Sequence, residues 1–134
     1  MAQTTGSGAG FLHPDSLSVE TLLIVNDSPW GSSLPLTALR FAEAAVGQGA
    51  SLHAVYFQHD GVYNALAGAE TDAGTPVLAE RWAGLARESG CALWLCSSAA
   101  ARRLVGDAWR APFEAVGKAR FLEAVARCRR MVSF

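Results

Sequence analysis

The chain has 134 residues, of which 51% are hydrophobic and 17% are charged, and its net charge at pH 7 is −1. This length fits one domain that buries a core without the help of metals or disulfides. A nearly neutral chain has no general attraction for a polyanion, which argues against direct nucleic-acid binding. The apolar composition also predicts that some hydrophobic surface contacts a partner subunit.

The N-terminal residues and the cysteine usage predict a cytoplasmic protein. Residues 1–19 are rich in Gly, Ser and Thr and lack the basic start and apolar centre of a signal peptide, so we expect a flexible tail. No stretch approaches the roughly 20 apolar residues that cross a membrane. Cys91, Cys96 and Cys128 are an odd number of cysteines without metal-ligand spacing, as in a reduced cytosolic chain.

The first half of the chain alternates apolar runs with a helical pattern. Residues 21–26 form a continuous apolar run, which is typical of a strand buried on both faces. After a turn-rich loop, hydrophobic residues recur at helical spacing from residue 36 to 47 or 49. Residues 51–57 are a second predicted strand. Residues 58–76 are then a long connection, of a length that is usually functional or mobile.

The second half continues the alternation. Residues 77–89 are a predicted helix that ends at Gly90, and residues 91–96 are the third strand. The remaining predicted elements are a short helix at 99–105, a strand at 112–116, a helix at 119–127 and a final strand at 130–134. This order predicts one α/β domain over residues 20–134, with three layers (α/β/α) and a mostly parallel sheet of about five strands.

Cys96 is the first candidate for a reactive side chain. It ends a predicted strand, and ligands gather at the carboxyl ends of parallel strands. The following helix start offers free backbone N–H groups, with Ser97 or Ser98 as the expected N-cap, and Arg102 and Arg103 add positive charge. All of these features favour the thiolate, which is the nucleophilic form. The alternative is a structural cysteine, because free cysteines are among the most buried residues.

Other candidate residues have simpler alternatives. Cys91 begins the strand that Cys96 ends, so we expect it to pack in the core. Cys128 lies among arginines that either activate it or form a solvated helix end. His59 is the histidine best placed to act as a base for Cys96, unless it is a solvated loop residue. Trp30 follows the first strand and either lines a pocket or packs elsewhere.

The spacing of Cys96 and Arg102 suggests a second enzyme class. Five residues separate them, as in cysteine phosphatases, whose loop turns its amide groups inward around a phosphate. Glycine usually helps such a loop to form, and residues 97–101 contain none. The sequence also shows no Asp-Pro general-acid segment. A phosphatase therefore remains an alternative hypothesis with one supporting feature.

Several quoted stretches together resemble the DsrE/TusD family of sulfur-relay subunits, and the TusD branch most. They are LLIVNDSPWGSS, ALRFAEAAVGQG, AVYFQHDGVYNA, LWLCSSAAARR and the closing CRRMVSF. The likeness extends from about Thr21 to Phe134. The chain differs from the family in its longer N-terminal tail and in a shorter span between Arg103 and Phe113.

The resemblance implies that Cys96 carries a persulfide. The residue pattern adds Ser97, Ser98, Arg102 and Arg103 as supporting residues, and the two arginines either tune the sulfur or dock an acidic partner. The sulfur would come from a TusA-type donor and pass to a TusE/DsrC-type acceptor, within a heterohexamer that also holds TusB-like and TusC-like subunits. Its destination would be the 2-thiouridine of the tRNA wobble position or, alternatively, dissimilatory sulfur oxidation. Thiol exchange of this kind needs no metal or other cofactor. A non-catalytic assembly subunit is a further alternative, and the strand-end cysteine argues against it.

Overall fold

The computed structural model describes residues 20–66, 78–106 and 108–134. The expected flexible tail at residues 1–19 and the end of the expected connection, residues 67–76, lie outside these ranges. Within the described part of the chain, no helix combines the length and the apolar character that crossing a bilayer requires.

Five strands form one sheet, and every strand pair in it is parallel. The strands are β1 (Glu20–Val25), β2 (Ser51–Phe57), β3 (Ala92–Cys96), β4 (Phe113–Val116) and β5 (Arg130–Ser133). Their order across the sheet is β4-β3-β2-β1-β5. The predicted α/β fold class is therefore confirmed, with a sheet that is parallel throughout.

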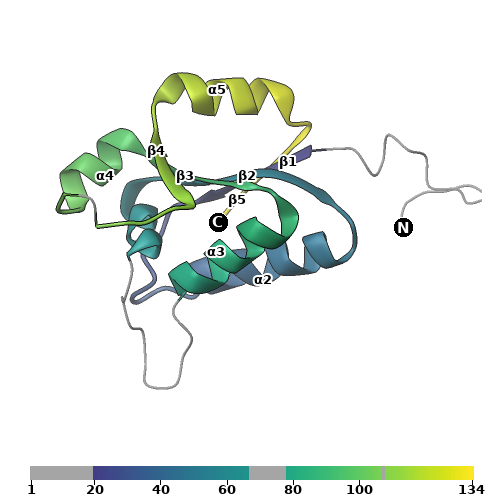
Figure 1. Ribbon diagram of the computed structural model, residues 1–134, viewed down its shortest axis with the longest axis horizontal. Coiled ribbons are helices and arrows are strands. Elements are labelled where there is room, and N and C mark those ends of the chain that lie inside the picture. The colour runs from purple at the N-terminus through teal and green to yellow at the C-terminus, as the bar shows by residue number, and fades with distance from the viewer. Residues whose placement is uncertain (1–19, 67–77, 107) are drawn as a thin grey trace, which may run out of the picture.

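Helices cover both faces of this sheet. They are α2 (Leu34–Gly47), α3 (Leu78–Ser89), α4 (Ser97–Arg103), α5 (Lys118–Arg127) and the 3₁₀ helix η1 (His59–Ala65). Figure 1 shows α2 and α3 on one face and α5 on the other, which makes the predicted three layers. Helix α4 and η1 contact each other near the end of β3.

Three predicted boundaries were wrong. Helix α2 begins at Leu34, before the predicted start, because Pro35 fits the first turn of a helix, where its missing N–H costs nothing. Helix α4 begins directly after β3, at Ser97. The predicted connection after β2 starts with η1, since Gly61 allows this segment to approach the end of β1 closely.

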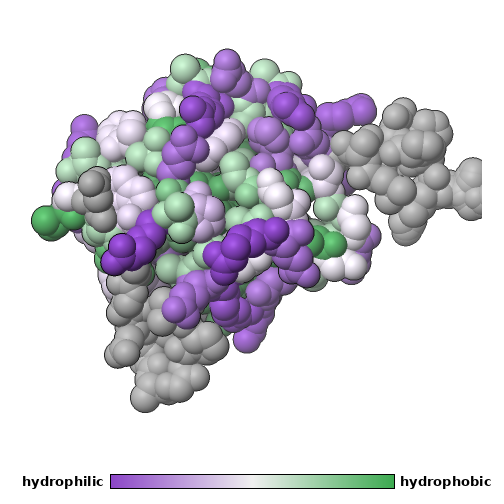
Figure 2. Space-filling view, in the orientation of Figure 1, coloured by the Kyte–Doolittle hydropathy of each residue, from purple (hydrophilic) through white to green (hydrophobic). Residues whose placement is uncertain are grey.

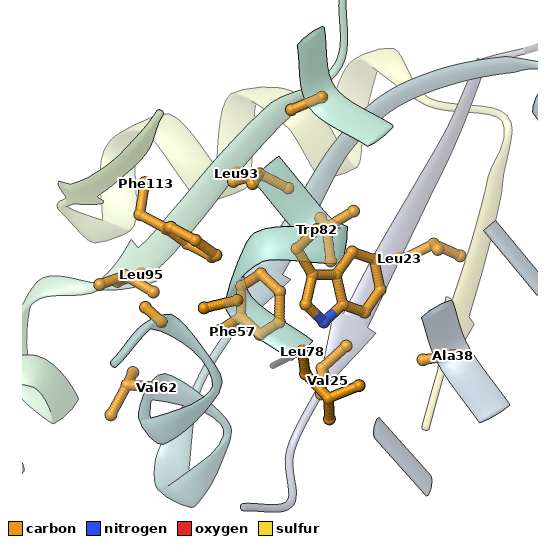
Figure 3. Close-up of a cluster of buried hydrophobic side chains, with 14 of the residues drawn as sticks. Leu23, Val25, Ala38, Phe57, Val62, Leu78, Trp82, Leu93, Leu95 and Phe113 are labelled. Carbon is orange, nitrogen blue, oxygen red and sulfur yellow. The ribbon is translucent and has the colours of Figure 1, made fainter. Parts of the chain in front are cut away.

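The main core lies between the sheet and helices α2 and α3. The side chain of Trp82 is fully buried there, and its ring meets that of Phe57 edge to face at 5.3 Å. Figure 3 shows Trp82 of α3 among side chains from several strands, including Leu23 and Leu93. The predicted buried face of this helix, with Leu78, Trp82 and Leu85, is thereby confirmed.

A smaller core lies under α5, on the other face. Its buried members are Leu22, Ala54, Tyr56, Trp94, Val116 and Ala124. Alternation along β3 explains the division, because Leu93 and Leu95 face α2 and α3 whereas Trp94 faces α5. The outward sides of α3 and α5 are mostly hydrophilic in Figure 2, as expected of helices that cover a sheet.

The connection that follows β3 and the connection that follows β4 run over opposite faces of the sheet. Helix α4, between them, buries Ala99 and Ala100 in the main core, on the side of α2 and α3. Helix α5 follows β4 and crosses the other face to reach β5, which pairs with β1. A sheet of this kind forms a crevice at the carboxyl ends of the two strands where the direction reverses. That position is where β3 ends at Cys96.

Candidate functional site

Cys96 lies at the carboxyl edge of the sheet, as predicted. It is the last residue of β3, pairs with Val116 at the end of β4 and serves as the N-cap of α4. Its side chain is half-buried and contacts both cores. The thiol is free, so the site presents a partly accessible sulfur at the crevice between β3 and β4.

The pKa of the Cys96 thiol is lower than that of an ordinary cysteine. Partial burial raises this pKa, but hydrogen bonding to the sulfur outweighs that effect. The groups responsible are the Tyr56 hydroxyl, the backbone N–H of Ala99 and both the hydroxyl and the N–H of Ser98. These donors stabilise the negative charge of the thiolate, and the thiolate is the form that attacks sulfur.

The expected capping by Ser97 or Ser98 was wrong. Cys96 itself occupies the N-cap, and Ser97 and Ser98 are the first two helical residues. In a capped helix, the N-cap side chain accepts hydrogen bonds from the N–H groups two or three residues later, which here belong to Ser98 and Ala99. These two N–H groups help to lower the pKa of Cys96, although the thiol makes no side-chain capping hydrogen bond. Ser98 therefore contributes to the site, but as a donor to Cys96.

Arg102 and Arg103 lie in the last turn of α4, away from the sulfur. A helix rises about 1.5 Å per residue, which separates these arginines from the helix start by roughly 9 Å along the axis. The Nε of Arg103 donates to the Asp60 carboxylate of η1 at 2.8 Å, and Arg102 is exposed. Neither charge is among the causes of the lowered pKa of Cys96, so their expected support of the thiolate has no basis in these contacts.

The helical conformation of α4 also removes the support for a phosphatase. Residues 97–103 are helical, so the amide groups between Cys96 and Arg102 run along a helix and do not curl around an anion. Arg102 lies at the far end of that helix. The spacing of the two residues is therefore explained by one short helix.

The other two cysteines lack the environment of Cys96. Cys91 is buried in the main core, as expected, and burial raises the pKa of its thiol. Burial also raises the pKa of Cys128, and the nearby Glu20 carboxylate raises it further, against the opposing effect of Arg127. Arginine neighbours therefore do not activate Cys128.

His59 does not act as a partner for Cys96 in this structure. It is exposed, and its backbone adopts a left-handed conformation with φ of 53° at the start of η1. Within the described ranges, no hydrogen bond or ion pair links His59 to the thiol. Trp30 lies at the same edge of the sheet, is 44% exposed and contacts the ring of Tyr63 at 5.4 Å.

Sequence reasoning missed two groups at this edge. Tyr56 was assigned only to a strand, although a buried tyrosine hydroxyl requires a hydrogen-bond partner, and this was a usable signal. Asn64 in η1 is also buried, and its amide donates to the backbone oxygens of Asp27 and Gly61, both at 2.9 Å. These contacts hold η1 against the loop that follows β1.

Fold and site together define a parallel α/β domain that presents a free thiol of lowered pKa where the sheet connections reverse. The sequence profile of the DsrE/DsrF-like family matches residues 20–134. The chain therefore belongs to the DsrE/DsrF-like family, and the resemblance found in the sequence is confirmed.

Relatives along most of the chain carry the name sulfurtransferase TusD. The protein of that name from Cronobacter sakazakii is 33% identical over 124 residues, which cover 84% of this chain and 97% of the relative. The sulfurtransferase TusD from Sodalis glossinidius is 33% identical over a region that covers 88% of this chain and 100% of the relative. The crystal structure of the YchN protein from E. coli has a TM-score of 0.74 at 16% identity, covering 87% of this chain and 99% of YchN, and supports the fold.

Proposed function

We propose that this protein is a sulfurtransferase subunit of a sulfur relay, and that Cys96 is the residue that carries the sulfur as a persulfide. The observation that carries the proposal is the free, half-buried Cys96 thiol with its lowered pKa at the carboxyl edge of the sheet. The similarity to sulfurtransferases TusD over most of the chain supports this class of reaction.

The first step loads the sulfur. The Cys96 thiolate attacks the outer sulfur of a donor persulfide, R–S–SH, and a new S–S bond forms on Cys96 as the donor's S–S bond breaks. The donor leaves as the thiolate R–S⁻, and the transferred sulfur keeps its proton until it ionises. One S–S bond forms and one S–S bond breaks, and the transferred sulfur keeps its oxidation state, so no external oxidant or reductant is required.

The second step releases the sulfur. The thiolate of an acceptor protein attacks the outer sulfur of the Cys96 persulfide, and Cys96 leaves as a thiolate. A leaving group of low pKa departs more readily, so the same hydrogen bonds assist both steps. The donors from Ser98 and Ala99 at the start of α4 are rigidly placed for this purpose, because they belong to a helix that packs in the core.

The finer assignment is a place in the tRNA-thiolating relay. The sulfur would arrive from a TusA-type donor and leave on a TusE/DsrC-type acceptor, toward the 2-thiouridine of the wobble base. TusB-like and TusC-like subunits would complete a heterohexamer. The likeness to TusD proteins supports this branch over dissimilatory sulfur oxidation. Exposed hydrophobic side chains, such as Leu122 and Met131, are suited to contacts between subunits.

The loading of Cys96 is tested by intact mass. The wild-type protein is incubated with a sulfane-sulfur donor such as a small persulfide, and we expect an adduct of one sulfur atom, about 32 Da, that dithiothreitol removes. Cys96→Ser should form no adduct. Cys128→Ser is the matched control, a second half-buried thiol, and should form it as wild type does. An adduct that persists in Cys96→Ser contradicts the proposal.

A further inference from the structure

The hydroxyl of Tyr56 is a polar group in an otherwise apolar core. Tyr56 is 1% exposed and belongs to the cluster under α5, whose other buried members are aliphatic residues and Trp94. Its ring stacks on that of Phe121 with centroids 4.2 Å apart and planes 25° apart. The side chain therefore has a defined orientation and few available partners for its hydroxyl.

The sheet register brings this hydroxyl to Cys96. Tyr56 pairs with Trp94 on the neighbouring strand β3, and Cys96 follows two residues later on the same face. From the spacing and rise of parallel strands, the Cα atoms of Tyr56 and Cys96 are roughly 8 Å apart, a separation that a tyrosine side chain bridges.

We propose that Tyr56 is a positioning residue for Cys96, and that its hydroxyl donates a hydrogen bond that holds the sulfur at the crevice and stabilises its anionic form. The effect on the thiolate is argued from the strand register and the burial of Tyr56, and it does not depend on the proposed function. Its extension to the bound persulfide deepens the proposed function and rests on it, because the charge of Cys–S–S⁻ lies at the same place.

The ionisation of both groups agrees with this arrangement. The Tyr56 hydroxyl contributes to the lowered pKa of Cys96, and the pKa of Tyr56 is itself raised, first by burial and then by the nearby sulfur. The phenol therefore keeps its proton at every pH at which the thiol ionises. It remains a donor both to the free thiolate and to the loaded site.

The test is the pH profile of Cys96 alkylation in Tyr56→Phe, followed by peptide mass spectrometry with iodoacetamide. At pH values below the midpoint of the profile, loss of one hydrogen bond to a charged group reduces the thiolate fraction by about tenfold. A more basic thiolate is more nucleophilic, and this recovers about half of that factor on a logarithmic scale. We therefore expect the rate to fall about threefold at low pH, to rise about threefold on the high-pH plateau, and the midpoint to move to higher pH.

This crossing of the two profiles separates positioning from a general loosening of the site. A merely structural role for Tyr56 changes the rate in one direction at every pH, and that result, or an unchanged profile, overturns the proposal. Tyr63→Phe is the matched control, since Tyr63 lies at the same edge of the sheet but packs on Trp30. The alkylation of Cys128 in the same samples reports whether the fold is intact.

Sulfur loading is measured separately on the same variants. If wild-type Cys96 forms no sulfur adduct, the proposed function fails, whereas the alkylation profiles still test the hydrogen bond. If wild type and Tyr56→Phe both form the sulfur adduct on Cys96 and their alkylation profiles coincide, the role of Tyr56 fails and the relay function stands. If the profiles cross, we expect the Tyr56→Phe adduct to form more slowly below neutral pH.

Discussion

Cys96 and Cys128 are both half-buried thiols, yet the pKa of one is lowered and that of the other is raised. Burial raises the pKa of each thiol, so the difference comes from the neighbouring groups. Groups at a helix start and the Tyr56 hydroxyl lower the pKa of Cys96, whereas the nearby Glu20 carboxylate raises the pKa of Cys128. The reactivity of a cysteine in this fold is therefore decided by a few nearby atoms.

Gly61 is a second residue whose role is decided by its surroundings. A Cβ atom at this position would lie 2.1 Å from the carbonyl oxygen of Val25 and 2.9 Å from its carbonyl carbon. Because the obstacle is backbone, no side chain can move away. We expect Gly61→Ala to lower the free energy of unfolding, measured in urea, by about 1–3 kcal/mol or more.

Gly84→Ala is the matched control for this prediction. Gly84 lies within α3, and a Cβ atom there has no heavy atom within 4 Å. Alanine has the higher helix propensity, so we expect this variant to be stabilised by about 0.5–1 kcal/mol. Equal changes in the two variants would contradict the close approach of η1 to β1.

At the scale of elements, η1 and α4 form one unit beside the thiol. The ion pair between Asp60 and Arg103 joins them at 2.8 Å, and its side chains are 62% and 28% exposed. A pair this exposed contributes little, so we expect a coupling energy of about 0.2–1 kcal/mol from a double-mutant cycle with Asp60→Ala and Arg103→Ala. The coupling should decrease at high salt because the charges face solvent.

The same variants show whether Arg103 acts on the sulfur. Arg103 contacts η1, and it is not among the causes of the lowered pKa of Cys96. Arg103→Ala should therefore leave the pH midpoint of Cys96 alkylation where wild type has it. A midpoint that moves to higher pH would restore the role that the sequence suggested for this arginine.

At the scale of the whole molecule, the end of the chain closes the sheet against its first strand. Strand β5 pairs with β1, the side-chain amide of Asn26 donates to the backbone oxygen of Phe134 at 2.9 Å, and Arg127 donates to Glu20 at 2.6 Å. These contacts join residues about a hundred positions apart. The folded sheet therefore depends on the last elements of the chain as well as on the first.

The Glu20 contact predicts an acid-dependent part of the stability. The hydrogen bond from Arg127 lowers the pKa of Glu20, against the effect of burial. A carboxyl group with a lowered folded-state pKa adds stability above its unfolded pKa, and this contribution is lost as the pH falls through the folded value. Urea unfolding across the acidic range should therefore show a steeper loss in wild type than in Glu20→Gln.

Glu88→Gln provides the comparison for Glu20→Gln. Glu88 is exposed on α3, and the described residues show no ion pair to it. Its removal should leave the wild-type dependence on pH unchanged. If Glu20→Gln also leaves that dependence unchanged, the link between the first strand and α5 does not contribute to acid stability.

The strands, most of the helices and the position of Cys96 at the end of β3 were predictable from the amino-acid sequence. These features depend on short-range patterns, namely apolar runs, helical spacing and turn residues, which the chain records locally. The family resemblance was also present in the sequence. By contrast, the sequence alone did not indicate η1, because its helix depends on the close contact between Gly61 and β1.

The groups that surround the thiol could be identified only in the folded protein. Strand pairing places Tyr56 beside Trp94, two residues before Cys96, and Arg103 turns to Asp60, 43 residues earlier in the chain. Local periodicity reports which face of an element is buried, but it does not report which strand lies next to it. The acidity of Cys96 depends on such neighbours, so it became apparent only when the sheet order and register were known.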